Sequence, residues 1–216
     1  MKDTCILCDF DGTVTEKDGL YSFFVKHANE GWREIEKAWN ENKISSKECL
    51  FKEFEAVPDL SPELIENHVK TVKLDPYFKD FLKFLSADKF DFYIVSDGAD
   101  YFINKALENS GIKGINIISN HFEFKNGSGF ILDFPNDSKD CTNNAGTCKC
   151  SVLKKMKQKY KQVIYIGDGI SDFCVSGRAD ILFAKKKLLN YCRGNNIKYI
   201  EFNTFKDIIN FLQAKF

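Results

Sequence analysis

Short apolar runs recur along the chain, separated by longer segments in which apolar residues follow helical spacing. Such runs, rich in β-branched and aromatic side chains, are typical of parallel strands that are covered on both faces. Their alternation with helical segments predicts an α/β fold, in which helices cover a parallel sheet. The predicted strands are residues 4–8, 92–95, 115–119, 163–166 and 181–184.

An insertion separates the first two predicted strands. The first ends at residue 8 and the second begins at residue 92, whereas a crossover connection needs only about a dozen residues. Ser45, with Glu48 three residues on, makes a capping box that predicts a helix start within this insertion. We therefore predict a helical cap domain at residues 15–74, inserted into a core domain made of residues 1–14 and 75–216.

Further patterns complete the predicted core. Apolar residues at helical spacing predict a helix over Phe78–Leu85, which leads from the insertion back to the sheet. Residues 121–134 alternate on either side of a glycine-containing turn, which predicts a β-hairpin. Thr204, with Asp207 three residues on, predicts the start of the last helix.

The composition limits the classes of partner. The 216 residues are 44% hydrophobic, enough for a sizeable core, and 31 basic residues balance 31 acidic ones. A chain without excess positive charge is not drawn to nucleic acid or to an anionic membrane. No apolar run approaches the roughly 20 residues that span a bilayer. We therefore expect a cytoplasmic protein, a monomer or homodimer, whose partners are small molecules.

The eight cysteines fit reduced thiols better than disulfides, because a chain of this size builds an ordinary core and shows no export signal. Only Cys141, Cys148 and Cys150 cluster along the chain. Their spacing differs from the paired C-x-x-C of structural zinc sites. A loop with reduced thiols is the preferred interpretation, and zinc binding is the alternative.

Two carboxylates, Asp9 and Asp11, occupy alternate positions directly after the first predicted strand. Open α/β sheets bind ligands beyond the carboxyl ends of their strands, so these side chains are placed for function. Two close carboxylates repel each other unless a cation lies between them or one holds a proton, and a hard cation with oxygen ligands meets that need. The alternative is an ordinary turn at residues 11–13.

A hydroxyl and a glycine-containing turn follow the second predicted strand, at Ser96-Asp97-Gly98. This segment is suited to hydrogen-bond an anion, although Ser96 is equally suited to cap a helix that begins near Asp100. Lys149 opens a later predicted helix. Most lysines are solvated, so Lys149 gains significance only beside the other elements.

A glycine-flanked acid, Asp168, follows the strand predicted at 163–166, and Asp172 comes four residues later. The glycines permit a tight turn that brings backbone and carboxylate to a cation. Taken singly, each residue also fits a strand, a turn and an acid near a helix N-terminus. Four such elements in this order favour a shared site.

Together, residues 9–15, Ser96-Asp97-Gly98, the isolated Lys149 and residues 167–172 resemble the four motifs of the haloacid dehalogenase superfamily. The resemblance covers the whole chain and implies a Rossmann-like core with a small helical cap after the first strand. The chain is similar to the phosphoserine phosphatase-like group. Its segment at residues 146–150 resembles the Cys-rich loop of methionine-salvage phosphatases that act on 2-hydroxy-3-keto-5-methylthiopentenyl-1-phosphate. The resemblance therefore implies a magnesium-dependent phosphatase that hydrolyses a small phosphorylated metabolite.

The resemblance also implies a role for each motif residue. Asp9 would attack phosphorus and form an aspartyl-phosphate, and Asp11 would protonate the leaving alkoxide and then activate water. Ser96 and Lys149 would bind the phosphoryl oxygens. The metal-binding residues would be Asp9, Asp11 through its backbone carbonyl, Asp168 and Asp172, the last as a ligand or as a carboxylate that orients Lys149 or a water.

Two cap residues, Asp18 and Phe23, lie nearest the first motif in sequence and are candidate substrate contacts, although a small helical module needs most of its aromatics for its own core. Arg33 stands on an early helix where a carboxylate-binding arginine is not expected, which argues against phosphoserine. Because Asp11 serves hydrolysis and transfer alike, phosphotransferase or phosphomutase activity stays open. A phosphoacceptor regulatory module is the alternative from another class.

Overall fold

The computed structural model describes residues 2–85, 90–141 and 144–216. Within them the strands are β1 (Thr4–Cys8), β2 (Phe90–Ala99), β3 (Asn116–Phe124), β4 (Phe130–Asp133), β5 (Gln162–Gly167), β6 (Ile181–Ala184) and β7 (Ile200–Glu201). They form one seven-stranded sheet in the order β4-β3-β2-β1-β5-β6-β7. Neighbours run parallel except β3 and β4, which pair as an antiparallel hairpin.

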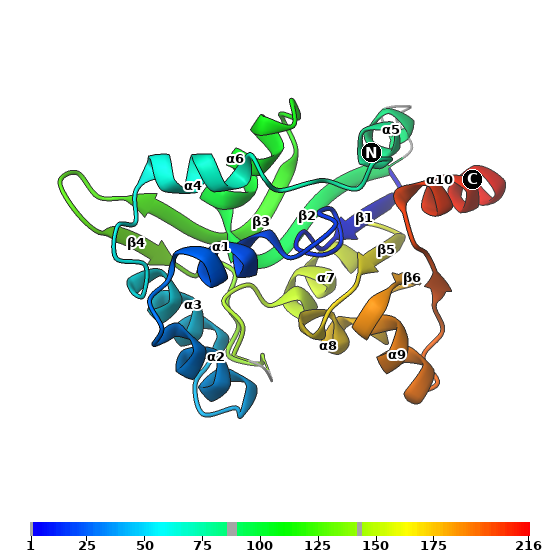
Figure 1. Cartoon of the computed structure of the whole chain (residues 1–216). Coiled ribbons are helices and arrows are strands. Elements are labelled where there is room, and N and C mark those ends of the chain that lie inside the picture. The colour runs from blue at the N-terminus through cyan, green and yellow to red at the C-terminus, as the bar shows by residue number, and fades with distance from the viewer. Residues whose placement is uncertain (1, 86–89, 142–143) are drawn as a thin grey trace.

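Helices cover both faces of this sheet (Figure 1). One face carries α5 (Phe78–Leu85), α6 (Asp100–Asn109) and α10 (Phe205–Lys215). The other carries α7 (Lys149–Lys157), α8 (Phe173–Ser176) and α9 (Lys186–Gly194). The predicted α/β fold with a parallel core, a helical insertion and a hairpin is confirmed.

The central strand shows why its sequence is continuously apolar. In β1, Cys5 and Leu7 pack among the apolar residues of α7, α8 and α9, whereas Ile6 and Cys8 pack among those of α5, α6 and α10. Side chains alternate between the two faces of a strand, and here both faces are covered. Every residue of β1 is buried as a result.

The structure corrects the predicted boundary between the third strand and the hairpin. The sequence pattern predicts a strand at 115–119 and a separate hairpin at 121–134, but β3 is one strand of nine residues. Its first half pairs with β2 up to Asn120, and its second half pairs with β4 from His121 onward. One strand can exchange partners along its length because each edge offers its own backbone groups.

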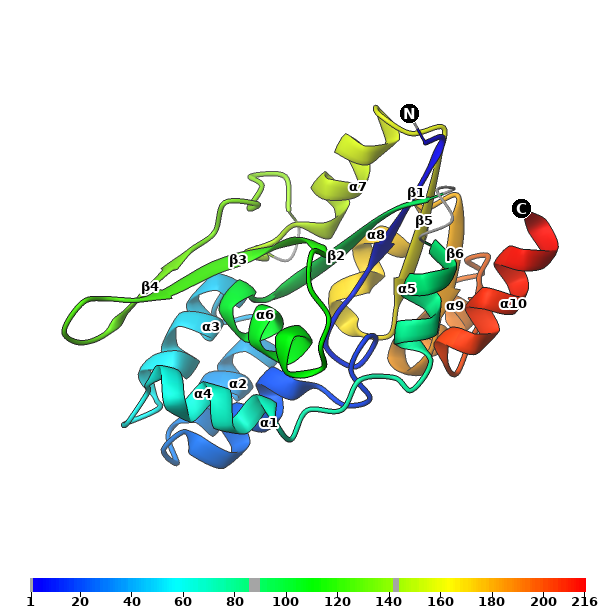
Figure 2. The same ribbon diagram turned by 90° about the horizontal axis from the view of Figure 1, so that it is seen from above.

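Four helices gather beside the β3–β4 end of the sheet (Figure 2): α1 (Gly19–His27), α2 (Trp32–Asn40), α3 (Ser46–Glu55) and α4 (Pro62–Val69). The predicted cap at Ser45 is confirmed, because Ser45 accepts the N–H of Glu48, and Ser61 caps α4 in the same way by accepting the N–H of Leu64. None of the helices in the described residues has the length and apolar character needed to cross a bilayer.

The two connections to these helices lie side by side. Thr15 and Leu74 form an isolated antiparallel bridge, and the N–H of Asp75 donates to the carbonyl of Val14 over 2.8 Å. The apolar core nevertheless continues across them, since the ring centroids of Phe54 in α3 and Phe122 in β3 lie 4.6 Å apart. The division into a cap at 15–74 and a core at 1–14 and 75–216 stays a prediction.

His68 in α4 makes this packing sensitive to acid. Its ring is 4% exposed, it lies 5.4 Å from the ring of His27, and its Nδ1 has no hydrogen-bond partner among the described residues. Burial, with His27 beside it, lowers the pKa of His68 from 6.5 to about 4.

Between pH 6.5 and about 4, His68 is therefore protonated in the unfolded chain but neutral in the folded chain. The free energy of unfolding falls as the pH is lowered through that range. Between pH 7 and pH 5 this one group removes about 2 kcal/mol from the free energy of unfolding. We expect His68→Leu to remove that share of the pH dependence in urea titrations. An unchanged difference between pH 7 and pH 5 in the variant would contradict the assignment.

Candidate active site

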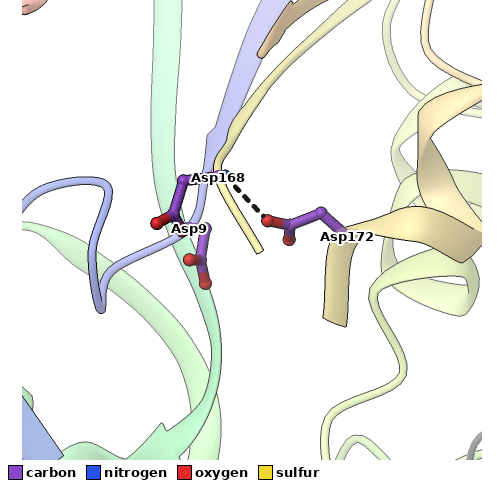
Figure 3. A group of neighbouring side chains, drawn as sticks. All are labelled: Asp9, Asp168 and Asp172. Carbon is purple, nitrogen blue, oxygen red and sulfur yellow. Dashed lines mark hydrogen bonds between the residues drawn. The ribbon is translucent and has the colours of Figure 1, made fainter. Parts of the chain in front are cut away.

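Three buried carboxylates meet where strands β1 and β5 end (Figure 3). Asp9 follows β1, Asp168 follows β5, and Asp172 ends the short helix η1 (Ile170–Asp172). One oxygen of each lies within 4.8 Å of the others. In the described residues this is the one group of three or more potential metal ligands. The predicted convergence at the carboxyl edge of the sheet is therefore present for these three residues.

Lys149, at the start of α7, binds two of these carboxylates. Its Nζ lies 2.6 Å from Asp9 Oδ1, 2.6 Å from Asp172 Oδ1 and 2.9 Å from Ser171 Oγ. Burial acts to lower the pKa of Lys149, but Asp172 and Asp9 outweigh it and raise the pKa above its ordinary value. The lysine is therefore a fixed cation inside the site.

The pKa of Asp9 reflects the opposite balance. Burial and the charges of Asp172 and Asp168 raise it, the Lys149 ammonium acts to lower it, and the resulting pKa is about 8. Two ammonium groups contact these three carboxylates, Lys149 at Asp9 and Asp172 and Lys186 at Asp168. A bound cation would favour the ionised form of Asp9.

All lone pairs of Asp172 are occupied by protein donors. Its Oδ1 accepts from Lys149 and, over 2.6 Å, from the hydroxyl of Tyr165. Its Oδ2 accepts the backbone N–H groups of Asp168 and Gly169, each over 3.0 Å. A carboxylate offers about four such sites, so Asp172 binds the turn and the lysine at full capacity.

Asp168 has a different surrounding. Its Oδ1 accepts from the hydroxyl of Thr13 over 3.1 Å, and its Oδ2 lies 3.0 Å from Lys186 Nζ. Gly12 has φ +77° and lies so close that a Cβ atom there would collide with Asp168 Oδ2. The glycine after Asp11 is therefore required both by the turn and by the approach of Asp168.

Asp11 lines the same cavity as Asp9 and Asp168, and its side chain hydrogen-bonds to the insertion. Its Oδ1 accepts the backbone N–H groups of Gly19 over 2.9 Å and Leu20 over 3.3 Å, both in the first turn of α1. Burial raises its pKa well above the usual value, and Asp18 and Asp9 add to the effect. Asp11 is thus a carboxyl that tends to hold a proton.

Ser96 does not cap a helix, contrary to the alternative considered from sequence. α6 begins at Asp100 with Ala99 in the N-cap position, while Ser96 Oγ accepts the N–H of Gly98 over 3.0 Å. The Ser96 hydroxyl is buried and has no acceptor among the described residues. It is available to donate to a ligand.

Asp97 holds the loop before Lys149. Its carboxylate accepts the N–H of Thr147 over 2.8 Å, and its carbonyl accepts from the Asn120 amide over 2.6 Å. A Cβ atom at Gly146 would collide with Asn120, so only glycine allows this close packing. The side chain of Asp97 therefore fixes the chain that leads to Lys149.

A cavity of about 680 Å³ lies between this site and helices α1, α2 and α3. Asp9, Ser96 and Asp168 line it on the side of the sheet, and Leu20, Trp39 and Glu53 line it on the side of the insertion. Its volume suits a small organic ligand.

Residues 4–192 of the chain match the protein family described as Putative Phosphatase. The chain belongs to this family. The phosphatase is 34% identical over 205 residues to the 2-hydroxy-3-keto-5-methylthiopentenyl-1-phosphate phosphatase of Bacillus velezensis, a match that covers 94% of this chain and 87% of that protein. It is 29% identical over 213 residues to the protein of the same name from Exiguobacterium sp., and that match covers 98% of each chain.

The fold is also that of solved phosphatases. A structure described as a phospho-aspartyl intermediate analogue of phosphoserine phosphatase superposes with a TM-score of 0.71 at 21% identity, and the match covers 98% of this chain and 99% of that one. The resemblance to haloacid dehalogenase-type phosphatases of the phosphoserine phosphatase-like group is confirmed, and the chain is a phosphoric monoester hydrolase of that fold.

The two predicted cap contacts lie in different places in the phosphatase. Asp18 lines the cavity and caps α1, since its carboxylate accepts the N–H of Tyr21 over 2.8 Å. The structure corrects the expectation for Phe23, which is fully buried among aromatic rings that include Phe102 and does not line the cavity. Apolar packing therefore accounts for Phe23. Arg33, on α2, is exposed and lies outside the cavity lining.

All eight cysteines of the phosphatase are free thiols. Cys141 and Cys148 are buried and Cys150 is partly buried. Within residues 2–85, 90–141 and 144–216, these three do not bring three metal-ligand atoms together. The described structure therefore gives the zinc alternative no support.

Several polar contacts at the site were missed from sequence. Lys186 contacts Asp168, Thr13 bridges Asp9 and Asp168, and Ser171 and Tyr165 contact the Lys149–Asp172 pair. The lysines at 185 and 186 do follow a predicted strand directly, which was the available signal. Tyr165 gave none, because its ring reads as part of an apolar strand.

Proposed function

We propose that this phosphatase hydrolyses a small phosphorylated metabolite with Asp9 as nucleophile and Mg²⁺ as cofactor. The observation that carries the proposal is the 2.6 Å contact of Lys149 Nζ with Asp9 Oδ1, beside Asp168 and below a cavity. The ammonium favours the ionised carboxylate that a nucleophile needs, and it brings positive charge to the position of a phosphoryl group.

The two carboxylates of the first motif divide the reaction between them. An oxygen of Asp9 bonds to phosphorus, the bond from phosphorus to the ester oxygen breaks, and Asp11 gives its proton to the leaving oxygen. Asp11 then takes a proton from water as that water attacks the aspartyl-phosphate, which releases inorganic phosphate and restores Asp9. The raised pKa of Asp11 supports the acid half of this role.

The phosphoryl oxygens need hydrogen-bond donors. We assign this role to the Ser96 hydroxyl, which is buried and without an acceptor in the part of the chain described, and to Lys149. Asp97 and Gly98 line the cavity beside Ser96 and complete the proposed phosphate site. Fixed donors of this kind stabilise the charge that develops in the transition state.

The donor set fits Mg²⁺. All candidate ligands are oxygens, as a hard cation prefers, and the carboxylates of Asp9 and Asp168 keep unused lone pairs. We propose that these two residues, with the backbone carbonyl of Asp11, hold the metal, while the fully engaged Asp172 holds Lys149. When bound, the metal supplies positive charge that offsets the phosphate dianion.

Removal of Mg²⁺ with EDTA is expected to stop turnover, because three carboxylates would then repel the substrate phosphate. Added MgCl₂ should raise the melting temperature of the phosphatase by binding the folded state alone. Asp168→Asn should remove most of that rise, whereas Asp133→Asn, at an exposed residue of β4, should keep it. Full activity in metal-free buffer would contradict the metal assignment.

We further propose 2-hydroxy-3-keto-5-methylthiopentenyl-1-phosphate, named for the relatives, as the first candidate substrate. A cavity of about 680 Å³ supports a substrate of that size. Phosphate release should be measured against a panel that includes this ester, phosphoserine and sugar phosphates. Release of inorganic phosphate supports hydrolysis, whereas a phosphorylated second product would indicate a phosphotransferase or phosphomutase instead.

Residues 15–74 are proposed to act as a cap domain that closes the site and selects the substrate. The hydrogen bonds from α1 to Asp11 support this role, since they join the insertion to the proposed acid. We propose that the protein works in the cytoplasm as a monomer or homodimer, on small molecules and without nucleic acid or membrane partners; balanced charge supports this.

A further inference from the structure

The insertion side of the cavity is mostly apolar, with three acids among its lining residues. Tyr21, Phe24, Trp39 and Leu50 contribute apolar surface, and Asp18, Glu36 and Glu53 contribute the carboxyls. The lining contains two lysines, Lys186 and Lys187, and no arginine from the described residues. None of the motifs accounts for these acids.

The three acids have different neighbours. Lys186 lies close enough to Asp18 for its positive charge to act on that carboxyl, and Lys187 acts on Glu36 in the same way. Glu53, on α3, is 7% exposed, forms no ion pair within the described structure and has no basic group acting on it. An unpaired buried carboxylate is costly, so such a group holds its proton instead.

The surroundings of Glu53 agree with a protonated carboxyl. Burial, followed by the charges of Glu36 in α2 and of Asp18 before α1, raises the pKa of Glu53 to about 8. The thiol of Cys49, one turn earlier on α3, hydrogen-bonds this carboxyl and acts to lower its pKa, but burial and the two acids outweigh that contact. Near neutral pH, Glu53 therefore offers an O–H donor to the cavity rather than a negative charge.

We propose that the Glu53 carboxyl donates a hydrogen bond to a carbonyl or hydroxyl oxygen on an uncharged tail of the substrate, and that it thereby determines substrate choice. The proposal rests on the proposed phosphatase function, because the phosphate is taken to lie at Ser96 and Lys149 across the same cavity. The apolar lining around Glu53 suits the carbon chain that bears this oxygen.

The same lining disfavours two other classes of substrate. A tail with a carboxylate would meet Asp18 and Glu36 and find no arginine to pair with it. A tail with an ammonium group would need Glu53 to ionise in an apolar surrounding, while the other two acids already lie near lysines. A tail with an uncharged oxygen acceptor requires neither an arginine partner nor the ionisation of Glu53.

The test compares three phosphate esters with the full-length phosphatase: dihydroxyacetone phosphate, with an uncharged tail; phosphoethanolamine, with an ammonium; and phosphoserine, with a carboxylate as well. The variants are Glu53→Ala, which removes the donor, and Glu53→Gln, whose amide still donates. Glu55→Ala, at an exposed position of the same helix, is the matched control.

We expect the wild type and the control to prefer dihydroxyacetone phosphate. Glu53→Ala should lower kcat/KM for that ester by about 10- to 100-fold, mainly through KM, as the loss of one buried hydrogen bond implies. Glu53→Gln should stay within about threefold of the wild type, because its N–H replaces the O–H. Above about pH 8, as Glu53 ionises and loses its O–H, kcat/KM of the wild type for this ester should fall towards that of Glu53→Ala while Glu53→Gln keeps its value.

Two results would overturn the inference while leaving the phosphatase function in place. One is an unchanged ranking of the three esters in Glu53→Ala. The other is a preference for phosphoethanolamine that Glu53→Gln loses as fully as Glu53→Ala, which would make Glu53 a carboxylate that binds a cation. Failure of the wild type to release phosphate from these three esters and from 2-hydroxy-3-keto-5-methylthiopentenyl-1-phosphate would instead reject the proposed function, and the inference with it.

Discussion

Asp9→Asn is expected to reduce kcat/KM by roughly 10⁴-fold or more, since removal of a covalent nucleophile leaves only binding and electrostatic contributions. An amide is a poor nucleophile, and it also weakens the proposed metal site that Asp9 shares with Asp168. Phosphate release in the presence of MgCl₂ measures the effect. Asp3→Asn, which changes an exposed acid just before β1, should retain full activity.

The fold should survive this substitution. Asp9 faces two other carboxylates and shares one ammonium with Asp172, and its raised pKa means that ionisation of Asp9 costs stability above its unfolded value of 3.8. Neutralising it relieves that repulsion, so the melting temperature of Asp9→Asn in metal-free buffer should equal or exceed that of the wild type. Retained turnover in a folded variant would remove Asp9 from the nucleophile role.

The ends of the strands were predictable because each rests on a local pattern. β1 and β6 have the predicted bounds, since their runs are buried on both faces and end at polar residues. The parallel order then brings Asp9 and Asp168 together without further information, because β1 and β5 are neighbours. α5 and the cap at Ser45 follow from equally local signals.

The remaining features depend on contacts between distant segments. Glu53 lies on an amphipathic helix, where a glutamate normally faces water, and it is buried only because α3 packs in the insertion with Glu36 of α2 and Asp18 nearby. Lys186 contacts Asp168 across 18 positions of sequence, and neither residue predicts the other. Two-residue β7 is defined by its pairing with β6 rather than by its own pattern. Each of these features therefore depends on tertiary packing, which the local sequence pattern does not contain.

Lys149→Met is expected to impair both catalysis and stability. Methionine matches the length of the side chain but leaves Asp9 and Asp172, each within 2.6 Å of the lost ammonium, facing each other without a cation. Loss of a donor to the developing phosphoryl charge costs about 10²- to 10³-fold in kcat. Breaking a buried ion pair by removing one partner costs about 3–5 kcal/mol of folding free energy.

The pH dependence of this penalty separates an electrostatic role from a packing role. At lower pH the carboxyl of Asp9, whose pKa is raised by burial, takes up a proton, so the loss of unfolding free energy in Lys149→Met should shrink between pH 8 and pH 5. Lys154→Met, on an exposed position of the same helix, should show neither effect. A penalty that stays constant with pH, or turnover equal to that of Lys154→Met, would mean that Lys149 serves only to fill space beneath the site.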